Sequence, residues 1–184
     1  MFSTPVKQVK GMERVSRNHP LAVMFGDLIH DQVARHVTSA GDPSVERYLT
    51  SLLLNFLHMD QLFAIKDDAG ERVESVIEMV AEGDVRLKAD SFEREREVHK
   101  HIGDYILFWS GVYPPFLRKL RVWNGAELVC DYTSQGKQSY QLVSTFDHSP
   151  YDQVAPTFGK LSEGFDDFTF VLKQVSEQVQ LYVA

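Results

Sequence analysis

Two histidines and two acidic residues crowd one eight-residue segment of the chain. Glu97, His101 and Asp104 follow one another at i, i+4 and i+7, so on a helix they lie along one face. Residues two apart on a helix point roughly 200° apart, so one metal ion cannot bind both His99 and His101. Glu97, His101 and Asp104 are therefore the candidate acid–base or metal-ligating set. We expect His99 to pair with Glu95 on a wetter face.

Each of these residues also has an ordinary structural explanation. His101 can form an i, i+4 pair with Glu97, as is common on helix surfaces. Asp104 borders an apolar stripe, where a carboxylate without a partner is costly. We therefore expect it to bond to a tyrosine or to one of three arginines: Arg94, Arg118 and Arg121.

A metal centre in a helical bundle needs carboxylates and Glu-x-x-His pairs from several helices. The only comparable spacing in this chain is Asp27-x-x-His30, because Val98 occupies the position three residues before His101. No metal is therefore expected. The alternative, if a metal is bound, is the set Glu97, His101 and Asp104.

The segment "DYTSQGKQSYQLV" is the expected partner of this histidine-rich stretch. On a helix, Tyr132, Gly136 and Tyr140 share one face. A glycine inside a helix costs about 1 kcal/mol relative to alanine, so Gly136 indicates a close crossing, with Gly103 as the matching notch. The crossing would bring Tyr132 or Tyr140 toward the acid and the histidine. The predicted ligand-binding site thus consists of four residues: His101, Asp104, Tyr132 and Tyr140.

The two stretches "GDYILFWSGVYP" and "DYTSQGKQSY" resemble a pattern found in uncharacterised bacterial all-helical proteins. The pattern is a glycine–aspartate pair, an apolar run, a glycine and a proline, followed by a tyrosine–glycine–tyrosine helix. The matching positions are Gly103, Asp104, Leu107, Phe108, Gly111, Pro114, Asp131, Tyr132, Gly136 and Tyr140. This resemblance implies a helical fold in which the two stretches pair, and it implies no particular reaction.

The helix that must carry these residues is predicted over about 91–112. Asp90, with Glu93 three residues later, has the spacing of a capping box, and a pair of prolines at 114 and 115 stops the helix. Its core stripe is expected to contain Val98, Ile102, Tyr105, Trp109 and Val112. Other helices should pack around this central one.

Helical periodicity recurs along the rest of the chain. A first helix is expected from Asn18 or His19, and a second, capped by Asp42, has a continuous apolar seam that extends to Phe63. A shorter amphipathic helix should follow, with Val73, Val76, Ile77 and Val80 on one face. Ser149 is expected to cap a helix that Pro156 kinks or restarts, and a last helix begins after Gly164.

Residues 117–129 fit two structures. The Asn124-Gly125 pair is a good hairpin turn signal, but a lone two-stranded hairpin is marginal without a sheet to join. We favour a short helix, a turn, and then a helix from about Ala126 to Phe146. The predicted fold is all-α, a single-domain bundle of six to eight helices over residues 18–184, preceded by a flexible tail over residues 1–17.

Composition narrows the possible classes of protein. The 184-residue chain carries a net charge of −7, which disfavours binding to the phosphates of nucleic acids. It has one cysteine and no apolar run near the roughly 20 residues needed to cross a bilayer. A cytoplasmic protein without a membrane partner is the expectation.

No complete catalytic constellation accompanies the polar and aromatic cluster. The leading hypothesis is a binding module that holds an unidentified protein or small molecule, either in a pocket between helices or on an interaction surface. The alternative is a helical enzyme, metal-assisted or not, that uses Glu97, His101 and Asp104. The sequence specifies neither a cofactor nor an oligomeric state.

Overall fold

The computed structural model describes residues 19–37, 41–67, 69–84 and 86–183. These residues form eight α-helices of eight or more residues, one single-turn helix and one 3-10 helix. They contain no β-strand, only an isolated bridge between Lys66 and Arg72. The predicted all-α bundle is thus confirmed, whereas the predicted tail over residues 1–17 lies outside the described residues.

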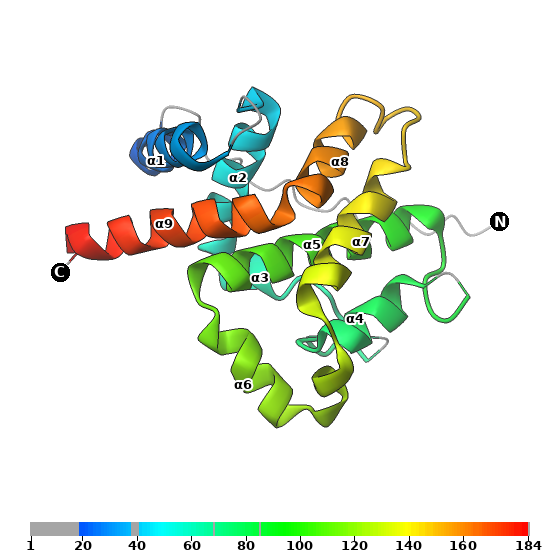
Figure 1. Cartoon of the computed structure of the whole chain (residues 1–184). Coiled ribbons are helices and arrows are strands. Elements are labelled where there is room, and N and C mark those ends of the chain that lie inside the picture. Colours follow the sequence, from blue (N-terminus) through cyan, green and yellow to red (C-terminus); the bar gives the residue numbers. More distant parts are fainter. Residues whose placement is uncertain (1–18, 38–40, 68, 85, 184) are drawn as a thin grey trace.

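The central helix, α5, spans Phe92–Val112 and is buried on most of its circumference. Its most extensive packing is against α7 (Tyr132–Ser144), α9 (Phe165–Val183) and α4 (Val76–Gly83) (Figure 1). Ser91 caps α5 through a hydrogen bond from the main-chain amide of Arg94, so the helix begins one residue later than a cap at Asp90 would allow. A helix at this position was predicted, and the other helices surround it.

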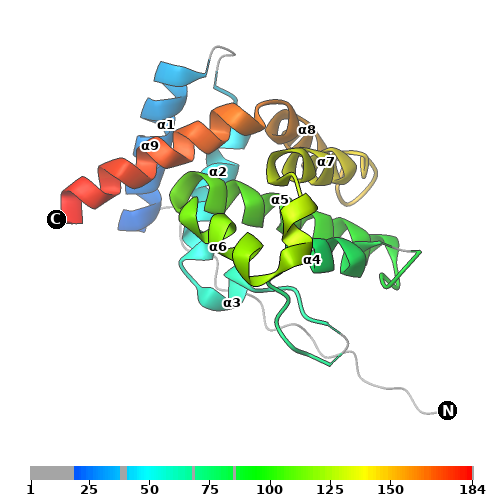
Figure 2. The ribbon, with the colours of Figure 1, turned by 60° about the horizontal axis from the view of Figure 1, so that its bottom comes forward.

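The α1 and α2 helices form one end of the molecule. α1 spans Pro20–His36 and is capped by His19, while α2 spans Pro43–Phe56 and is capped by Asp42. α9 packs against both α1 and α5, and so connects this end to the central helix (Figure 2). Both caps precede a proline in the first turn, where the missing amide hydrogen costs nothing.

The predicted continuous helix to Phe63 is wrong. α2 ends at Phe56, and the single turn α3 (Met59–Leu62) follows after Leu57 and His58. Leu57 is 56% exposed, whereas Phe63 is only 7% exposed. The break therefore turns the later part of the apolar seam into the core instead of extending it along a straight helix.

The ambiguous region is neither a hairpin nor the start of a long helix. α6 spans Pro115–Trp123, and a 3-10 helix, η1, spans Gly125–Val129. α7 starts only at Tyr132, because the Asp131 side chain accepts hydrogen bonds from the amide and the hydroxyl of Ser134. The predicted helix from Ala126 to Phe146 therefore begins six residues too early.

A turn separates α7 from α8 (Ala155–Glu163). Ser149 does not cap a helix as predicted, because it lies in this turn and α8 starts only at Ala155. The Ser149–Pro150 peptide bond is cis. The guanidinium of Arg96 lies 3.8 Å from the ring centroid of Tyr151 and so ties the turn to α5. α9 begins at Phe165, after Gly164, as predicted.

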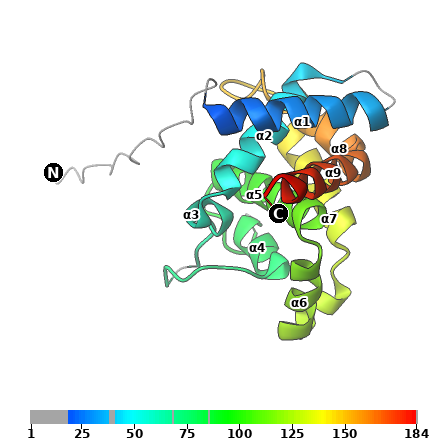
Figure 3. The same ribbon diagram turned by 90° about the vertical axis from the view of Figure 1, so that its left-hand side faces the viewer.

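α6 projects from the end of α5, away from α1 and α2 (Figures 1 and 3). Within the described residues, no helix has both the length and the apolar character needed to cross a membrane.

Candidate functional site

Asp104 lies in the interior of the bundle and is only 4% exposed. Its Oδ1 accepts hydrogen bonds from the hydroxyls of Tyr48 at 2.5 Å and Tyr140 at 2.8 Å. Its Oδ2 lies 2.6 Å from the ammonium of Lys100, one helical turn earlier. The predicted tyrosine contact is therefore present, but the cation is a lysine of the same helix and not an arginine.

Burial raises the pKa of Tyr48 and Tyr140 well above the ordinary value for tyrosine, and the neighbouring carboxylate adds to this effect. Both hydroxyls therefore stay protonated and donate. With three donors around it, Asp104 joins α2, α5 and α7 at one point.

The crossing of α5 and α7 depends on Gly103. A Cβ atom placed on Gly103 would lie 2.5 Å from Cε1 of Tyr140, so the phenol ring occupies the space of the missing side chain. Gly136 is also buried, but it faces Phe165 of α9, whose Cζ would lie 2.5 Å from an added Cβ. The two glycines therefore accommodate different aromatic rings. They do not face each other at the crossing, as was predicted.

Tyr132 takes no part in the Asp104 cluster. Its ring lies under the guanidinium of Arg121, 4.6 Å from the ring centroid, and the fully buried Glu127 is the acid that acts on its hydroxyl. Burial, followed by the effect of Glu127, raises the pKa of Tyr132. The structure thus brings together three of the four predicted ligand-binding residues and places Tyr132 in a second polar cluster near η1.

His101 is 8% exposed and lies close to Phe56 and Tyr105, with ring centroids 6.0 and 5.9 Å away. Burial lowers its pKa to about 4, although Asp104 acts in the opposite direction. Its Nε2 atom is buried and forms no hydrogen bond of ordinary geometry, although the main chain of Leu62 lies close enough to act on the imidazole. The predicted surface pair with Glu97 is therefore wrong: Glu97 is exposed, whereas the histidine is an uncharged interior residue.

His99 is buried as well, which corrects the prediction of a wet-face pair with Glu95. Its Nδ1 lies 3.2 Å from the hydroxyl oxygen of Ser139 on α7, and burial lowers its pKa. Gln135 donates to the same hydroxyl oxygen at 3.1 Å. Ser139 is fully buried, so this serine–histidine pair has no access to a substrate and serves packing.

A cavity of about 250 Å³ opens beside the Asp104 cluster, between the α2–α3 segment and α5. Polar and charged side chains make up most of its wall. They are Asn55, Gln61, Arg94, Glu97, Lys100, His101 and Asp104. The predicted helix face Glu97–His101–Asp104 is thus one wall of a cavity, and the second wall comes from a segment that the sequence reasoning had not connected to it.

Sequence reasoning missed two members of the Asp104 cluster. Lys100 precedes Asp104 by four residues, which is the spacing of a helical ion pair and could have identified it. Tyr48 lies 56 residues away, and no local pattern connects it to Asp104. Among the described residues, no three histidine, cysteine or acidic side chains converge to hold a metal ion.

Comparison with known protein families, curated proteins and solved structures gave no match for this chain. The pairing of the two motif stretches, α5 with α7, is present in the structure, while membership of the resembling family stays a prediction.

Proposed function

We propose that the protein is a binding module for a small polar molecule carrying an anionic group, held in the cavity between the α2–α3 segment and α5. The observation that carries this proposal is the interior histidine on the cavity wall. His101 lines the cavity, is more than nine-tenths buried, and has an Nε2 atom without a hydrogen bond of ordinary geometry. Buried polar atoms in proteins nearly always find a partner, so an open one beside a cavity favours a ligand.

The charges on the wall indicate the chemistry of that ligand. Within the described part of the chain, the half-buried guanidinium of Arg94 forms no ion pair. Lys100 is already paired with Asp104, and Glu97 lies at the exposed edge. Arg94 can therefore donate hydrogen bonds to a carboxylate or phosphate oxygen at low desolvation cost, while the histidine meets a second polar group of the same molecule.

The surroundings of Asp104 favour a binding role for the protein over a catalytic one. A general base needs a free lone pair within reach of the substrate, but Asp104 is enclosed by Tyr48, Tyr140 and Lys100. Its role in the proposal is to fix the position of α5 next to the cavity. The enzyme alternative with Glu97, His101 and Asp104 has no comparable supporting observation.

Ligand-induced stabilisation tests the proposal. Thermal unfolding would be followed with acetate, succinate, glutamate and inorganic phosphate as separate probes at about 10 mM, because a ligand that binds only the folded state raises its stability by mass action. We expect at least one probe to raise the melting temperature and to shift the ¹⁵N resonance of His101 Nε2.

Two variants make the test specific to the cavity. Arg94→Gln should abolish the shift, whereas Arg118→Gln, which removes an exposed arginine of α6 far from the cavity, should leave it intact. Equal losses in both variants would indicate nonspecific screening. If none of the four probes stabilises the wild-type protein, the proposed ligand class is wrong.

A further inference from the structure

The exposed face of α6 combines cations with large apolar side chains. Arg118, Lys119, Val122 and Trp123 form a continuous strip by helical spacing, which we call the α6 stripe. Val122 is 83% exposed and Trp123 is 68% exposed. Soluble proteins rarely leave such side chains together in water without a use, and tryptophan beside arginine is typical of the centres of protein interfaces.

The α6 helix is also strongly basic in a chain whose net charge is negative. It contains Arg118, Lys119 and Arg121 and no acidic residue, so it carries +3 while the rest of the chain carries −10. A partner for the stripe must therefore offer apolar surface bordered by acids.

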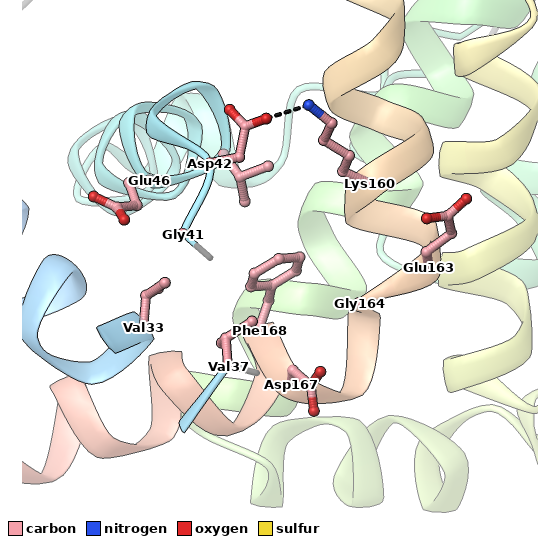
Figure 4. A pocket seen from close by; sticks show the side chains of 11 residues that line it. Val33, Val37, Gly41, Asp42, Glu46, Lys160, Glu163, Gly164, Asp167 and Phe168 are labelled. Carbon is pink, nitrogen blue, oxygen red and sulfur yellow. Dashed lines mark hydrogen bonds and ion pairs between the residues drawn. The ribbon is translucent and has the colours of Figure 1, made fainter. Parts of the chain in front are cut away.

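The opposite end of the same molecule has a groove with this composition (Figure 4). A cavity of about 370 Å³ opens between the end of α1, the start of α2, and the junction of α8 with α9. Its floor is apolar and consists of Val33, Val37, Val45 and Phe168. We call this cavity the acidic groove, because of the residues on its rim.

Four carboxylates and one ammonium group surround the opening: Asp42, Glu46, Glu163, Asp167 and Lys160. Lys160 is bonded to Asp42 and Glu46 to His30, which leaves two acids of the rim, Glu163 and Asp167, in excess. Glu163 and Asp167 are exposed, and within the described residues neither has an ion-pair partner. The rim therefore carries negative charge, opposite in sign to the charge of the α6 stripe.

We infer that the α6 stripe of one molecule docks in the acidic groove of a second copy, with Trp123 on the apolar floor and Arg118 and Lys119 facing Glu163 and Asp167. α6 and the groove lie at opposite ends of the fold, so a molecule cannot fill its own groove (Figures 1 and 3). The contact is heterologous, and it joins copies head to tail.

A symmetric contact of two α6 stripes is the less favourable arrangement. It would place Arg118 and Lys119 of one copy against the same cations of the other, and like charges across an interface disfavour association. The head-to-tail contact instead pairs each cation with an acid. It goes beyond the proposed ligand binding, because none of its residues lines the cavity at His101.

The contact is small, so the association should be weak and visible only at high protein concentration. Sedimentation velocity of the whole chain between about 10 μM and 1 mM covers the range expected for an interface below the standard size. We expect the weight-average mass to rise with concentration. Raising NaCl from about 50 mM to about 500 mM should reduce this rise, because the opposed charges are screened.

Charge exchange identifies the two surfaces. One variant carries Arg118→Glu and Lys119→Glu, and the other carries Glu163→Lys and Asp167→Lys. Each variant alone should associate at least about tenfold more weakly than the wild type, because both of its surfaces then have the same sign. An equimolar mixture should regain association, because each reversed surface meets its opposite on the other variant.

An apolar pair of variants completes the test. Trp123→Ala should weaken association, whereas Phe92→Ala removes an aromatic side chain of nearly equal exposure, 67%, and should have no effect. All substituted positions are at the surface, and circular dichroism checks that each variant folds. A wild-type protein that stays monomeric throughout the range overturns the inference. So does a mixture of the two charge variants that fails to associate.

Discussion

The phenol ring of Tyr140 fills the space next to Gly103, and its hydroxyl lies 2.8 Å from Oδ1 of Asp104, the following residue on α5. The missing side chain at one position thus makes room for the hydrogen bond at the next. The two helices can approach closely only because these features coincide. The arrangement links a sequence motif, the glycine–aspartate pair, to the burial of a charged group.

Gly103→Ala should therefore destabilise the protein, although alanine is the better helix former. The gain in helix propensity is about 1 kcal/mol. Against it stands the overlap with the Tyr140 ring, which is fully buried and held by its hydroxyl, and overpacking of this kind typically costs about 1–3 kcal/mol. Urea unfolding should show a net loss of up to about 2 kcal/mol, the difference between these two effects.

The matched control is Gly159→Ala in the middle of α8. There an added Cβ would meet only the Cβ of Ser144, at an ordinary contact distance of 3.9 Å. This variant should gain about 0.5–1 kcal/mol from helix propensity alone. Similar changes in both variants would show that the Tyr140 ring yields without cost.

The hydroxyls that hold Asp104 can be removed one at a time. Tyr140→Phe and Tyr48→Phe should each cost about 1.5–3 kcal/mol, the usual range for a hydrogen bond to a charged group. In the double variant only Lys100 remains as a partner, so its loss should exceed the sum of the two. A strictly additive result in denaturant unfolding would show that the two hydroxyls act independently.

The contacts of Asp104 also show which parts of the site could be predicted from the sequence. Tyr140 was predicted as a candidate partner because helical periodicity places it on the α7 face that carries Tyr132 and Gly136. Lys100 was identifiable from its spacing to Asp104, but the arginines were considered instead. Tyr48 was not identifiable, because its contact depends on how α2 packs across α5, and local sequence carries no record of that packing.

His99 and His101 were misplaced for a related reason. The charged start of α5 suggests a solvated helix surface, so both histidines were assigned to surface pairs. In the fold, Ser139 of α7 covers one ring and Phe56 of α2 covers the other. The helices that pack against a helix decide which of its faces is buried. The sequence pattern of this one helix therefore predicted the helix correctly but its solvent-exposed face incorrectly.

The second polar cluster gives a local prediction. Glu127 is fully buried, and its Oε1 accepts hydrogen bonds from the hydroxyl of Ser75 at 2.6 Å and the amide of Ile77 at 3.1 Å, at the start of α4. Glu127→Ala should leave these donors unsatisfied and cost about 1–3 kcal/mol. Hydrogen exchange should show the largest loss of protection at the Ile77 amide.

Ala126→Ser is a suitable control for the Glu127 variant, because the neighbouring residue is exposed and should tolerate the change. Protection at Ile77 that persists without the glutamate would show that α4 does not depend on η1 for its capping.

The interior position of His101 predicts an acid-sensitive fold. Its pKa falls from the ordinary 6.5 to about 4 in the folded protein, so between these values the unfolded chain binds a proton that the folded chain does not. Stability should therefore be fully present above about pH 6.5 and decrease as the pH falls toward 4, by about 3 kcal/mol from this group. His99, whose pKa is also lowered by burial, acts in the same direction.

Urea unfolding at several pH values should show a flatter profile for His101→Gln than for the wild type, while His58→Gln, at an exposed histidine, should leave the slope unchanged. Parallel profiles for the wild type and His101→Gln would contradict the interior placement.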